Sequence, residues 1–544
     1  MKQLGLLLLV FSLSGCSSTL QNLTDTDYLK TSLESLFEPN PDSATIEKQD
    51  DIPDIIHPAE QVTDTLADIK LEPDIPDEPS PKKFDNLWDY LAQNMSLPYA
   101  NNARLQAKKE WYLKHPQYMD RVAKRAGPFL YYIIQEIEAR ALPLELALLP
   151  IVESSFDPFA YSHGSAAGMW QFISSTGKRY GMNQNWWYDG RRDVIASTRG
   201  ALDYLAYLHR YFDGDWLHAL AAYNSGEGRV GKAIKANRRA GKPTDFWSLK
   251  LPRETRSYVP KLLALVDILK HGNKYDFTWP HIPNEPVIDV VETGSQIDLA
   301  LAAEFSGLSV TELHALNPGY NRWATAPDGP HRLVLPKQNI AQFKARLAST
   351  APDERLHWVR HKVKRGESLG TIAQRYTTTI DVIKTFNQLK SNTIYQNQYL
   401  LVPVALQSLD NYTLTQSQRL AKLQNKPSQS IKIKHTVVSG DTLWDLARKY
   451  KVSSKAIARW NGMGPKDFIR PGQNLVIHLP KDKKAGILRN IIYTVRSGDS
   501  LARIGQKFSV KIRDIIRWNQ LEGQKYLQPG QKLKLSVDVT KASS

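Results

Sequence analysis

Three strings near the C-terminal end of this 544-residue chain recur with one internal spacing, and this repeat constrains the fold more than any other feature. The strings are KVKRGESL, TVVSGDTL and TVRSGDSL, which contain Gly366, Gly440 and Gly498. An asparagine follows each glycine after twenty-one residues, and a short apolar strand begins shortly after the thirty-second residue. Such a period indicates copies of one supersecondary unit. Each copy is predicted to be a βααβ module of about 45 residues.

The repeated strings resemble the LysM domain, a module that binds glycans containing N-acetylglucosamine. The resemblance implies three LysM modules, over residues 358–404, 434–480 and 490–537. It also implies that glycan binds at the turns of the last two modules, through Gly440, Asp441, Thr442, Gly498, Asp499 and Ser500. Polar linkers are predicted at 406–432 and 481–490.

A fourth, degenerate copy is predicted over residues 286–337. The string VVETGSQIDLALAAEF is followed there by LNPGYN, so that Gly294 and Asn317 are twenty-three residues apart. The proline-rich end of this segment departs from the repeat pattern. A LysM-like fold is therefore expected, while glycan binding by this copy stays open.

The N-terminus carries an export pattern. Lys2 is followed by an apolar stretch over residues 4–13, and the string LSGC ends at Cys16, the only cysteine of the chain. A basic start, a short apolar run and small residues are typical of a signal peptide, and the run is too short to span a membrane. The string LSGC resembles the lipobox of bacterial lipoproteins. The resemblance implies a signal peptide over 1–15, lipidation of Cys16 and, with Ser17 next, attachment to the periplasmic face of the outer membrane.

Charge is distributed unevenly along a chain whose net charge is +16. Residues 17–80 hold sixteen Asp and Glu against three Lys and Arg, with seven prolines. Residues 16–85 are therefore predicted to be an acidic, proline-rich stalk with too little apolar surface to fold. Residues 357–544 carry thirty-three Lys and Arg against eleven Asp and Glu. Because an exported protein rarely meets nucleic acid, the expected partner of this basic tail is anionic peptidoglycan.

Residues 86–275 follow a helical pattern. Apolar residues recur at helical spacing over 196–212, 216–223 and 258–269, and residues 154–161 interrupt the pattern. A mainly α domain of roughly 190 residues is predicted. The whole chain is thus expected to be a multidomain α+β protein, acting as a monomer.

Glu153 ends the apolar run LELALLPIVE. A carboxyl group at the end of an apolar helix lies at the mouth of a hydrophobic pocket, where desolvation raises its pKa. A general acid that works near neutral pH needs such a shift. On this string alone, a solvent-facing or helix-capping glutamate is the favoured interpretation.

Four strings that follow one another in the sequence favour the catalytic interpretation of Glu153. Glu153-Ser154 is followed by GMWQF over 168–172, AYNSG over 222–226 and ETRSYV over 254–259. Together they resemble the catalytic domain of lytic transglycosylases, whose fold is similar to goose-type lysozyme. The resemblance implies that Glu153 is the single catalytic acid. It also implies a set of substrate-binding residues, namely Ser162, Gln171, Tyr223, Asn224 and Tyr258.

The resemblance further implies a reaction without metal, cofactor or added water. Glu153 would protonate the β-1,4 bond after N-acetylmuramic acid, and the acetamide of the sugar would stabilise the cation. Glu153 would then take a proton from the C6 hydroxyl, which closes a 1,6-anhydro ring.

Other interpretations remain open. An ordinary glycosidase uses two carboxyl groups, and Asp157 and Glu254 are available as the second one. Glu254 is expected to be structural, because it opens a predicted helix where its charge favours the helix dipole. Trp186 and Trp187 could line the groove or pack in the core. A hydrolytic muramidase and a catalytically silent wall-binding scaffold are the alternative functions, and the intact Glu153 argues against the scaffold.

Overall fold

The computed structural model describes residues 25–37, 84–162, 165–275, 277–426, 430–465, 467–479, 488–508, 510–521 and 527–538. The chain divides into two compact units, residues 1–421 and 422–544. The export signal and Cys16 lie outside the described residues. Among the helices that are described, none is long and apolar enough to cross a membrane.

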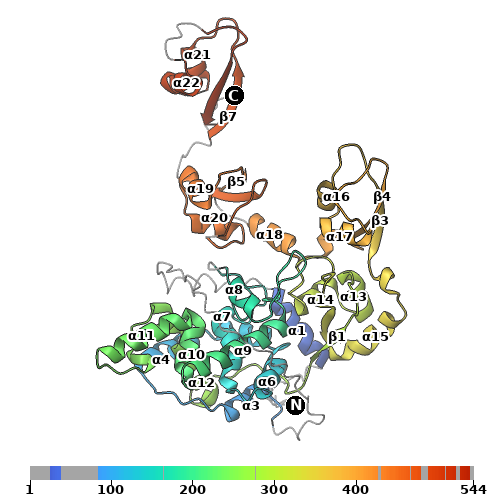
Figure 1. The fold of residues 1–544 in the computed structure, drawn as a ribbon. Coiled ribbons are helices and arrows are strands. Elements are labelled where there is room, and N and C mark those ends of the chain that lie inside the picture. Colours follow the sequence, from blue (N-terminus) through green and yellow to red (C-terminus); the bar gives the residue numbers. More distant parts are fainter. Residues whose placement is uncertain are drawn as a thin grey trace, which may run out of the picture. The chain divides into compact units, whose positions relative to one another are not determined.

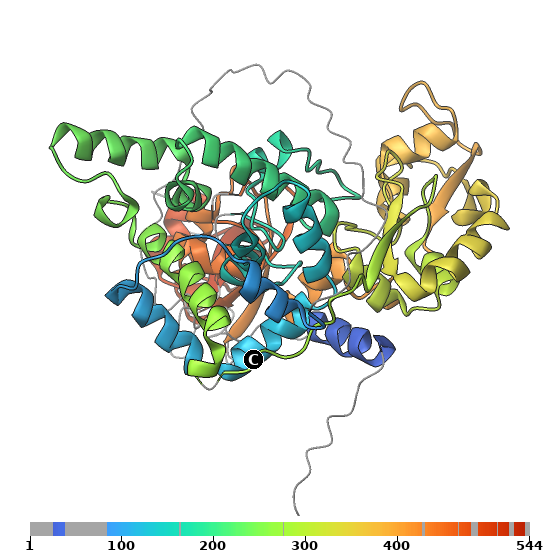
Figure 2. The same cartoon turned by 90° about the horizontal axis from the view of Figure 1, so that it is seen from below.

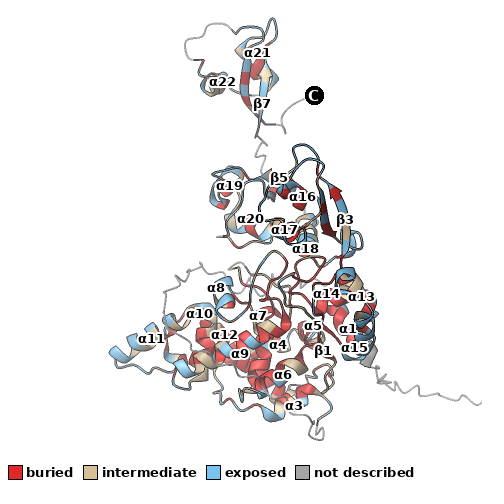
Figure 3. Ribbon diagram, turned by 45° about the vertical axis from the view of Figure 1, so that its right-hand side comes forward, coloured by how far each residue is buried: buried red, intermediate tan, exposed pale blue. Residues whose placement is uncertain are grey.

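A helical domain occupies residues 84–275 of the first unit (Figure 1). Its longest helices, α9 and α12, bury half or more of their residues and form the centre of the core (Figure 3). By contrast, α11 buries only Val230 among its residues and extends away from the other helices (Figure 2). The helices of this domain are α3 Leu87–Asn94, α4 Ala103–Leu113, α5 Pro116–Ala126, α6 Leu130–Glu138, α7 Leu149–Ser154, α8 Ser174–Arg179, α9 Val194–Tyr211, α10 Trp216–Ser225, α11 Glu227–Arg239 and α12 Arg253–Lys270, with 3₁₀ turns at Leu144–Leu148, Phe246–Ser248 and Gly272–Lys274.

Side-chain caps fix where the central helices begin. Asp193 accepts a hydrogen bond from the backbone N–H of Ala196 at the start of α9. Asp215 does the same for His218 at the start of α10. Each cap satisfies an N–H group that the helix itself leaves unpaired. The predicted mainly α domain is confirmed.

Residues Asp25–Phe37 form a helix, α1, inside the segment that was expected to be an unfolded stalk. Leu29, Leu33 and Leu36 are buried and belong to the core of the helical domain. Arg125 on α5 donates a hydrogen bond from Nε to the carbonyl oxygen of Ser35 (3.1 Å). The prediction of an unfolded stalk is therefore wrong for these thirteen residues.

The degenerate copy folds as a βααβ module. Strand β1 (Ile288–Glu292) pairs antiparallel with β2 (Arg332–Pro336), and α13 (Leu299–Ser306) and α14 (Val310–Leu316) lie between them in the chain. Helix α15 (Ile340–Ala348) follows the second strand. The predicted LysM-like fold is confirmed for this segment.

The three regular copies have the same βααβ order, and each contains one antiparallel pair of strands. The α+β class and the predicted last strand of each copy are thus confirmed. The elements are β3 His357–Lys362, α16 Leu369–Arg375, α17 Ile380–Phe386 and β4 Tyr399–Val404 in the first copy, β5 Ile431–Thr436, α19 Leu443–Tyr450, α20 Ser454–Trp460 and β6 Asn474–Leu479 in the second, and β7 Leu488–Thr494, α21 Leu501–Lys507, α22 Ile512–Asn519 and β8 Lys532–Asp538 in the third.

The repeated asparagine explains the fixed spacing. In the second copy, Asn461 donates hydrogen bonds from Nδ2 to the carbonyls of Ile457 and Val476, and its Oδ1 accepts from the N–H of Val476. The side chain thus joins the end of the second helix to the last strand. Asn317, Asn387 and Asn519 make the equivalent three bonds in the other copies.

The degenerate module packs against the helical domain within the first unit. Asp193 forms an ion pair with Arg332 (3.0 Å) and accepts a hydrogen bond from the Tyr188 hydroxyl (2.8 Å). Trp187 and Tyr188 belong to the core of the module rather than to that of the helical domain.

The linker after the first regular copy also packs in the first unit, although a polar linker was expected there. Leu406 N–H and the Tyr412 hydroxyl donate hydrogen bonds to Asp298 of the degenerate module. A 3₁₀ turn (Leu409–Asn411) and helix α18 (Gln416–Asn425) continue the segment, and Arg419 lies 4.8 Å from the centre of the Phe159 ring. The beginning of the predicted polar linker is therefore packed on the first unit and contains a helix.

Candidate active site

Glu153 is the second-last residue of α7, which ends at Ser154. Ser154 Oγ donates hydrogen bonds to the carbonyls of Met169 (2.9 Å) and Pro150 (3.2 Å), which ties the end of α7 to the GMWQF string. Ser155 and Phe156 have positive φ angles of 57° and 56°, and the helix stops there. The half-buried carboxyl of Glu153 thus lies at the end of a short helix. The Ser154 hydrogen bonds and the turn at Ser155 and Phe156 fix the position of this helix end.

The Tyr258 hydroxyl donates a hydrogen bond to Glu153 Oε1 at 2.6 Å. Tyr258 is buried on α12, whose first turn carries Glu254. Burial raises the pKa of the Glu153 carboxyl to about 8. The hydrogen bond from Tyr258 and the charge of Lys261 lower this pKa, while the charge of Glu254 raises it. A carboxyl group in this environment is protonated at neutral pH and can act as a general acid.

Lys261 is a residue of this environment that the sequence analysis missed. It lies three residues after Tyr258 on α12, and residues with this spacing share one face of a helix. The helical spacing from Tyr258 is the signal that could have identified it.

The GMWQF turn is joined to the end of α7 through the bond from Ser154 to Met169. Gly168 has a φ of 81°, and a Cβ at this position would lie 1.8 Å from the carbonyl oxygen of Arg191. Only glycine fits there, which explains the first residue of the string. Gln171 has a φ of 49° and donates from Nε2 to the carbonyl of Gly168 (2.7 Å). Because the Nε2 group is used in this bond, the predicted contact of Gln171 with substrate would be made by its amide oxygen.

Tyr223 and Asn224 lie near the end of α10. The Tyr223 hydroxyl donates to the carbonyl of Trp170 (2.9 Å), and its ring packs on Phe172. The charge of Glu153 adds to burial in raising the Tyr223 pKa, so the two side chains are electrostatic neighbours.

Asn224 connects α10 to the first turn of α12. It accepts a hydrogen bond from Thr255 Oγ1 (2.8 Å) and donates to Glu254 Oε1 (3.4 Å). Asn224 and Glu254 are thus linked beside the acid.

Ser162 shapes the turn before the GMWQF string. Its Oγ accepts a hydrogen bond from the N–H of Ala166 (3.1 Å). Its predicted contact with sugar remains a prediction.

The two proposed second carboxylates differ in position. Asp157 is surrounded by arginines: burial raises its pKa, and the charges of Arg125, Arg419 and Arg192 lower it. Glu254 is exposed, lies in the first turn of α12 and acts on the pKa of Glu153. The expected position of Glu254 at a helix start is confirmed, and of the two only Glu254 is an electrostatic neighbour of the acid.

The two adjacent tryptophans have different surroundings. Trp187 is buried in the core of the degenerate module, as one of the two interpretations expected. Trp186 is half-buried, and the guanidinium of Arg322 lies 4.1 Å from the centre of its ring.

In the second unit, the predicted glycan-binding residues form the turn before the first helix of each copy. Thr442 and Ser500 are N-caps of α19 and α21. Asp441 and Asp499 accept hydrogen bonds from the backbone N–H three residues earlier. Gly440 and Gly498 have φ angles of 90° and 86°. These side chains thus have structural roles, and their contact with glycan remains a prediction.

Two exposed aromatic side chains of the second copy escaped the sequence analysis. Trp444 is 59 % exposed and Phe468 is 95 % exposed. Aromatic faces of this kind can stack on sugar rings.

No group of three or more His, Cys, Asp or Glu side chains within the described residues is placed to hold a metal ion.

Family models match most of the folded chain. The "Transglycosylase SLT domain" matches residues 131–246, the "Lytic transglycosylase MltD, LysM-like domain" matches 287–351, and the "LysM domain" matches 361–403, 435–478 and 493–536.

Two curated proteins and one solved structure are similar to parts of the chain. Membrane-bound lytic murein transglycosylase D of Escherichia coli K12 is 37% identical over 455 residues, which is 83% of this chain and 86% of that protein. A "Putative tributyltin chloride resistance protein" of Alteromonas sp. M-1 is 42% identical over 186 residues, or 34% of this chain and 88% of that protein. The structure of an inactive mutant of lytic transglycosylase Slt from Pseudomonas aeruginosa is 22% identical, with a TM-score of 0.24, and covers 35% of this chain and 32% of that one.

Proposed function

Because this chain belongs to the family of membrane-bound lytic murein transglycosylase D and is a lytic transglycosylase acting on peptidoglycan, we propose that Glu153 is its single catalytic acid and base. The observation that carries the proposal is the pair formed by Glu153 and Tyr258. A half-buried carboxyl group with a pKa of about 8 holds a proton at neutral pH, and the Tyr258 hydroxyl fixes its direction.

The first step is proton donation from Glu153 to the oxygen of the β-1,4 bond that follows N-acetylmuramic acid. The bond between this oxygen and C1 of the muramic acid breaks, and the acetamide of the same sugar stabilises the resulting cation. The Tyr258 hydroxyl remains hydrogen-bonded to the carboxylate and stabilises its new charge.

In the second step the Glu153 carboxylate takes the proton of the C6 hydroxyl. The C6 oxygen then bonds to C1, which gives a 1,6-anhydromuramoyl end and returns the proton to Glu153. The substrate supplies the nucleophile, so the reaction needs neither a second carboxylate nor water.

We propose that Gln171, Asn224, Tyr223 and Ser162 line the substrate groove beside the acid. Tyr223 is an electrostatic neighbour of Glu153, and Asn224 is bonded to Glu254, which also acts on the acid. Gln171 lies on the turn that Ser154 joins to α7, and Ser162 lies on the turn before it.

Hydrolysis by the same domain is the alternative, and one observation favours testing it. Glu254 is close enough for its charge to act on Glu153. A hydrolytic enzyme would use such a second carboxylate to activate water.

Mass analysis of muropeptides released from purified sacculi decides between the two reactions. We expect 1,6-anhydromuramoyl ends and no new reducing ends. Borohydride-reducible muramic acid as the main product would overturn the transglycosylase mechanism, and Glu153→Gln is the control for contaminating activity.

The family points to a location in the cell envelope. We propose that Cys16 carries the lipid anchor, that the anchor lies on the periplasmic face of the outer membrane, and that the chain acts as a monomer. Membrane partitioning of Cys16→Ala tests the anchor, since a variant that still requires detergent for release would show that another segment holds the protein.

We also propose the domain division given by the sequence, with α1 reassigned from the stalk to the helical domain. The family matches support it, because they fall within or overlap residues 86–275, 286–337, 358–404, 434–480 and 490–537.

A further inference from the structure

An arginine cluster lies where three segments of the first unit meet. Arg192 comes from the helical domain, Arg322 from the degenerate module and Arg419 from helix α18 of the linker. The charges of Arg192 and Arg322 both act on Arg419, and burial lowers the pKa of Arg419 to about 9 and that of Arg322 to about 10. The three guanidinium groups thus lie close enough to repel one another in a partly desolvated environment.

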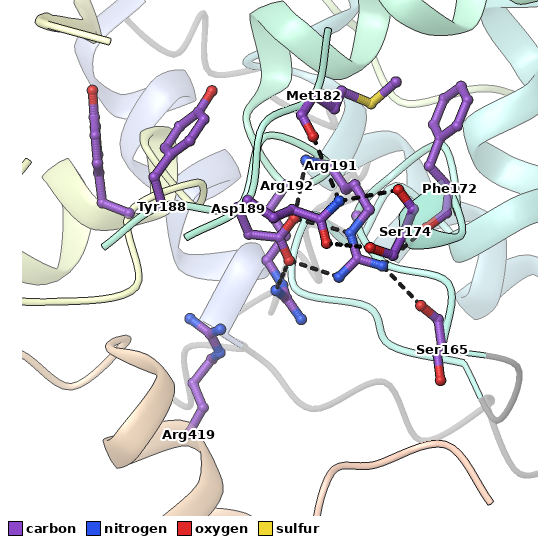
Figure 4. A network of polar contacts seen from close by, with 12 residues as sticks. Ser165, Phe172, Ser174, Met182, Tyr188, Asp189, Arg191, Arg192 and Arg419 are labelled. Atoms are coloured by element: carbon purple, nitrogen blue, oxygen red, sulfur yellow. Dashed lines mark hydrogen bonds and ion pairs between the residues drawn. The ribbon is translucent and has the colours of Figure 1, made fainter. Parts of the chain in front are cut away.

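The nearest carboxylates neutralise this cluster only in part, because Asp189 forms an ion pair with Arg192 alone among the three arginines. Asp189 accepts four hydrogen bonds, three from Arg191 and one from Arg192, so its two oxygens are already occupied (Figure 4). Asp157 uses Oδ1 to accept from the N–H of Phe159. Within the described residues, neither Arg322 nor Arg419 forms an ion pair with a carboxylate.

Two guanidinium groups have unused donors. The Nε atoms of Arg192 and Arg322 are buried and have no hydrogen-bond partner among the described residues. The Arg192 side chain is only 9 % exposed, so its Nε cannot readily bond to bulk water. An unpaired buried donor on a cation is costly, and an anion would offset that cost.

The cluster reaches the surface on the side of the active-site loop. Arg322, Arg419, Trp186 and Phe159 are all half-buried. Arg419 lies over the ring of Phe159 and Arg192 over the ring of Tyr161. Both rings belong to the segment that carries Ser162, and Tyr161 pairs with Ala167 just before the GMWQF turn. With Ser162 lining the proposed groove, an anion in the cluster would lie beside the bound glycan strand.

We propose that the arginine cluster binds a carboxylate of the peptide stem that branches from the glycan strand. This inference rests on the proposed function, because the stem is attached to the muramic acid whose bond Glu153 cleaves. Planar guanidinium groups suit a carboxylate, which they bind with two parallel hydrogen bonds. The degenerate module thereby supplies a substrate contact even though its own glycan binding is unassigned.

The test compares two substrates that differ only in the stem. Soluble, uncrosslinked glycan strands are assayed with their stems and after an amidase has removed them. Arg322→Gln and Arg419→Gln, singly and together, are measured against Arg346→Gln, an exposed arginine of α15 in the same unit.

We expect each cluster variant to raise KM for stem-bearing strands by about ten-fold, the lower end of the range for a hydrogen bond to a charged group. KM for denuded strands should change by less than about two-fold on that scale, and Arg346→Gln should match the wild type on both substrates. Stem-bearing strands whose carboxylates have been amidated should behave like denuded strands.

An equal loss on both substrates, or no change on either, would overturn the proposal and leave the cluster as a packing feature. Arg419→Lys guards against misfolding, because it keeps the charge and removes the planar fork, and it should give an intermediate KM. If the wild type forms no 1,6-anhydromuramoyl ends from either substrate, the proposed function has failed instead.

Discussion

Tyr258 Oη lies 2.6 Å from Glu153 Oε1, although the two residues are 105 positions apart in the chain. The contact joins the short helix α7 to the long central helix α12. It places a hydroxyl donor on the carboxyl group of Glu153, whose pKa burial raises to about 8. The reactivity of Glu153 therefore depends on how α12 is packed.

Tyr258→Phe removes that hydroxyl group and keeps the ring. The hydrogen bond lowers the pKa of Glu153, so its loss should move the basic limb of the kcat profile to higher pH. We also expect kcat to fall by about ten- to a hundred-fold, since the carboxyl group loses its fixed direction. A pH profile of turnover measures both effects, and an unchanged basic limb would contradict the assignment.

Glu153→Gln should remove nearly all turnover, because general acid catalysis is worth ~10²–10⁴-fold. The same substitution should stabilise the fold at high pH. The folded state keeps its proton up to about pH 8, while the unfolded chain loses it near 4.5, so wild-type stability falls as pH rises between these values.

The Gln variant lacks this loss and should be more stable than the wild type by on the order of 4 kcal/mol at pH 8. The difference should vanish at pH 4. Thermal unfolding at the two pH values measures it, and equal stability at pH 8 would show that Glu153 is not desolvated.

Glu254→Gln separates the two reactions. The charge of Glu254 raises the pKa of Glu153, so its removal should shift the basic limb of activity to lower pH. Turnover at pH 6 should stay within about three-fold, and the product should remain 1,6-anhydromuramoyl. Loss of all activity, with reducing ends as the wild-type product, would assign Glu254 to water activation.

Arg332→Met tests the contact between the degenerate module and the helical domain. It leaves Asp193, whose side chain is 11 % exposed, without its ionic partner. Breaking a buried ion pair from one side costs about 3 kcal/mol or more. We expect a lower unfolding temperature of the first unit, whereas Arg346→Met in the same unit should leave it unchanged.

Removal of residues 422–544 should weaken attachment to sacculi and leave cleavage of a short soluble glycan unchanged. Two modules facing a repetitive polymer can add ~10²–10⁴-fold in avidity. Sedimentation with sacculi measures attachment. Binding by the removed fragment should survive about 1 M salt, where the Debye length is ~3 Å, and should be competed by chitin oligomers. Complete release by salt, with no effect of chitin oligomers, would make the fragment a generic cation.

The repeats, the helical domain and the place of Glu153 followed from local strings, because each depends on spacing within one segment. Contacts between segments had no such signature. Arg332 and Asp193 are 139 residues apart, and nothing near either residue indicates the other. Helix α1 is an intermediate case: Leu29, Leu33 and Leu36 have helical spacing, but the acidic composition of residues 17–80 obscured it.

If Cys16 carries the lipid anchor, as proposed above, the position of α1 limits how far the enzyme can work from its membrane. With the lipid on Cys16, Asp25, where α1 begins, lies nine positions along the chain from the anchor. A fully extended chain of that length spans roughly 30 Å. The seventy-residue stalk that the composition predicted would have allowed a distance between anchor and catalytic unit several times greater. If Cys16 is the anchor, docking of α1 shortens this tether and would restrict cleavage to the layer of wall nearest the membrane.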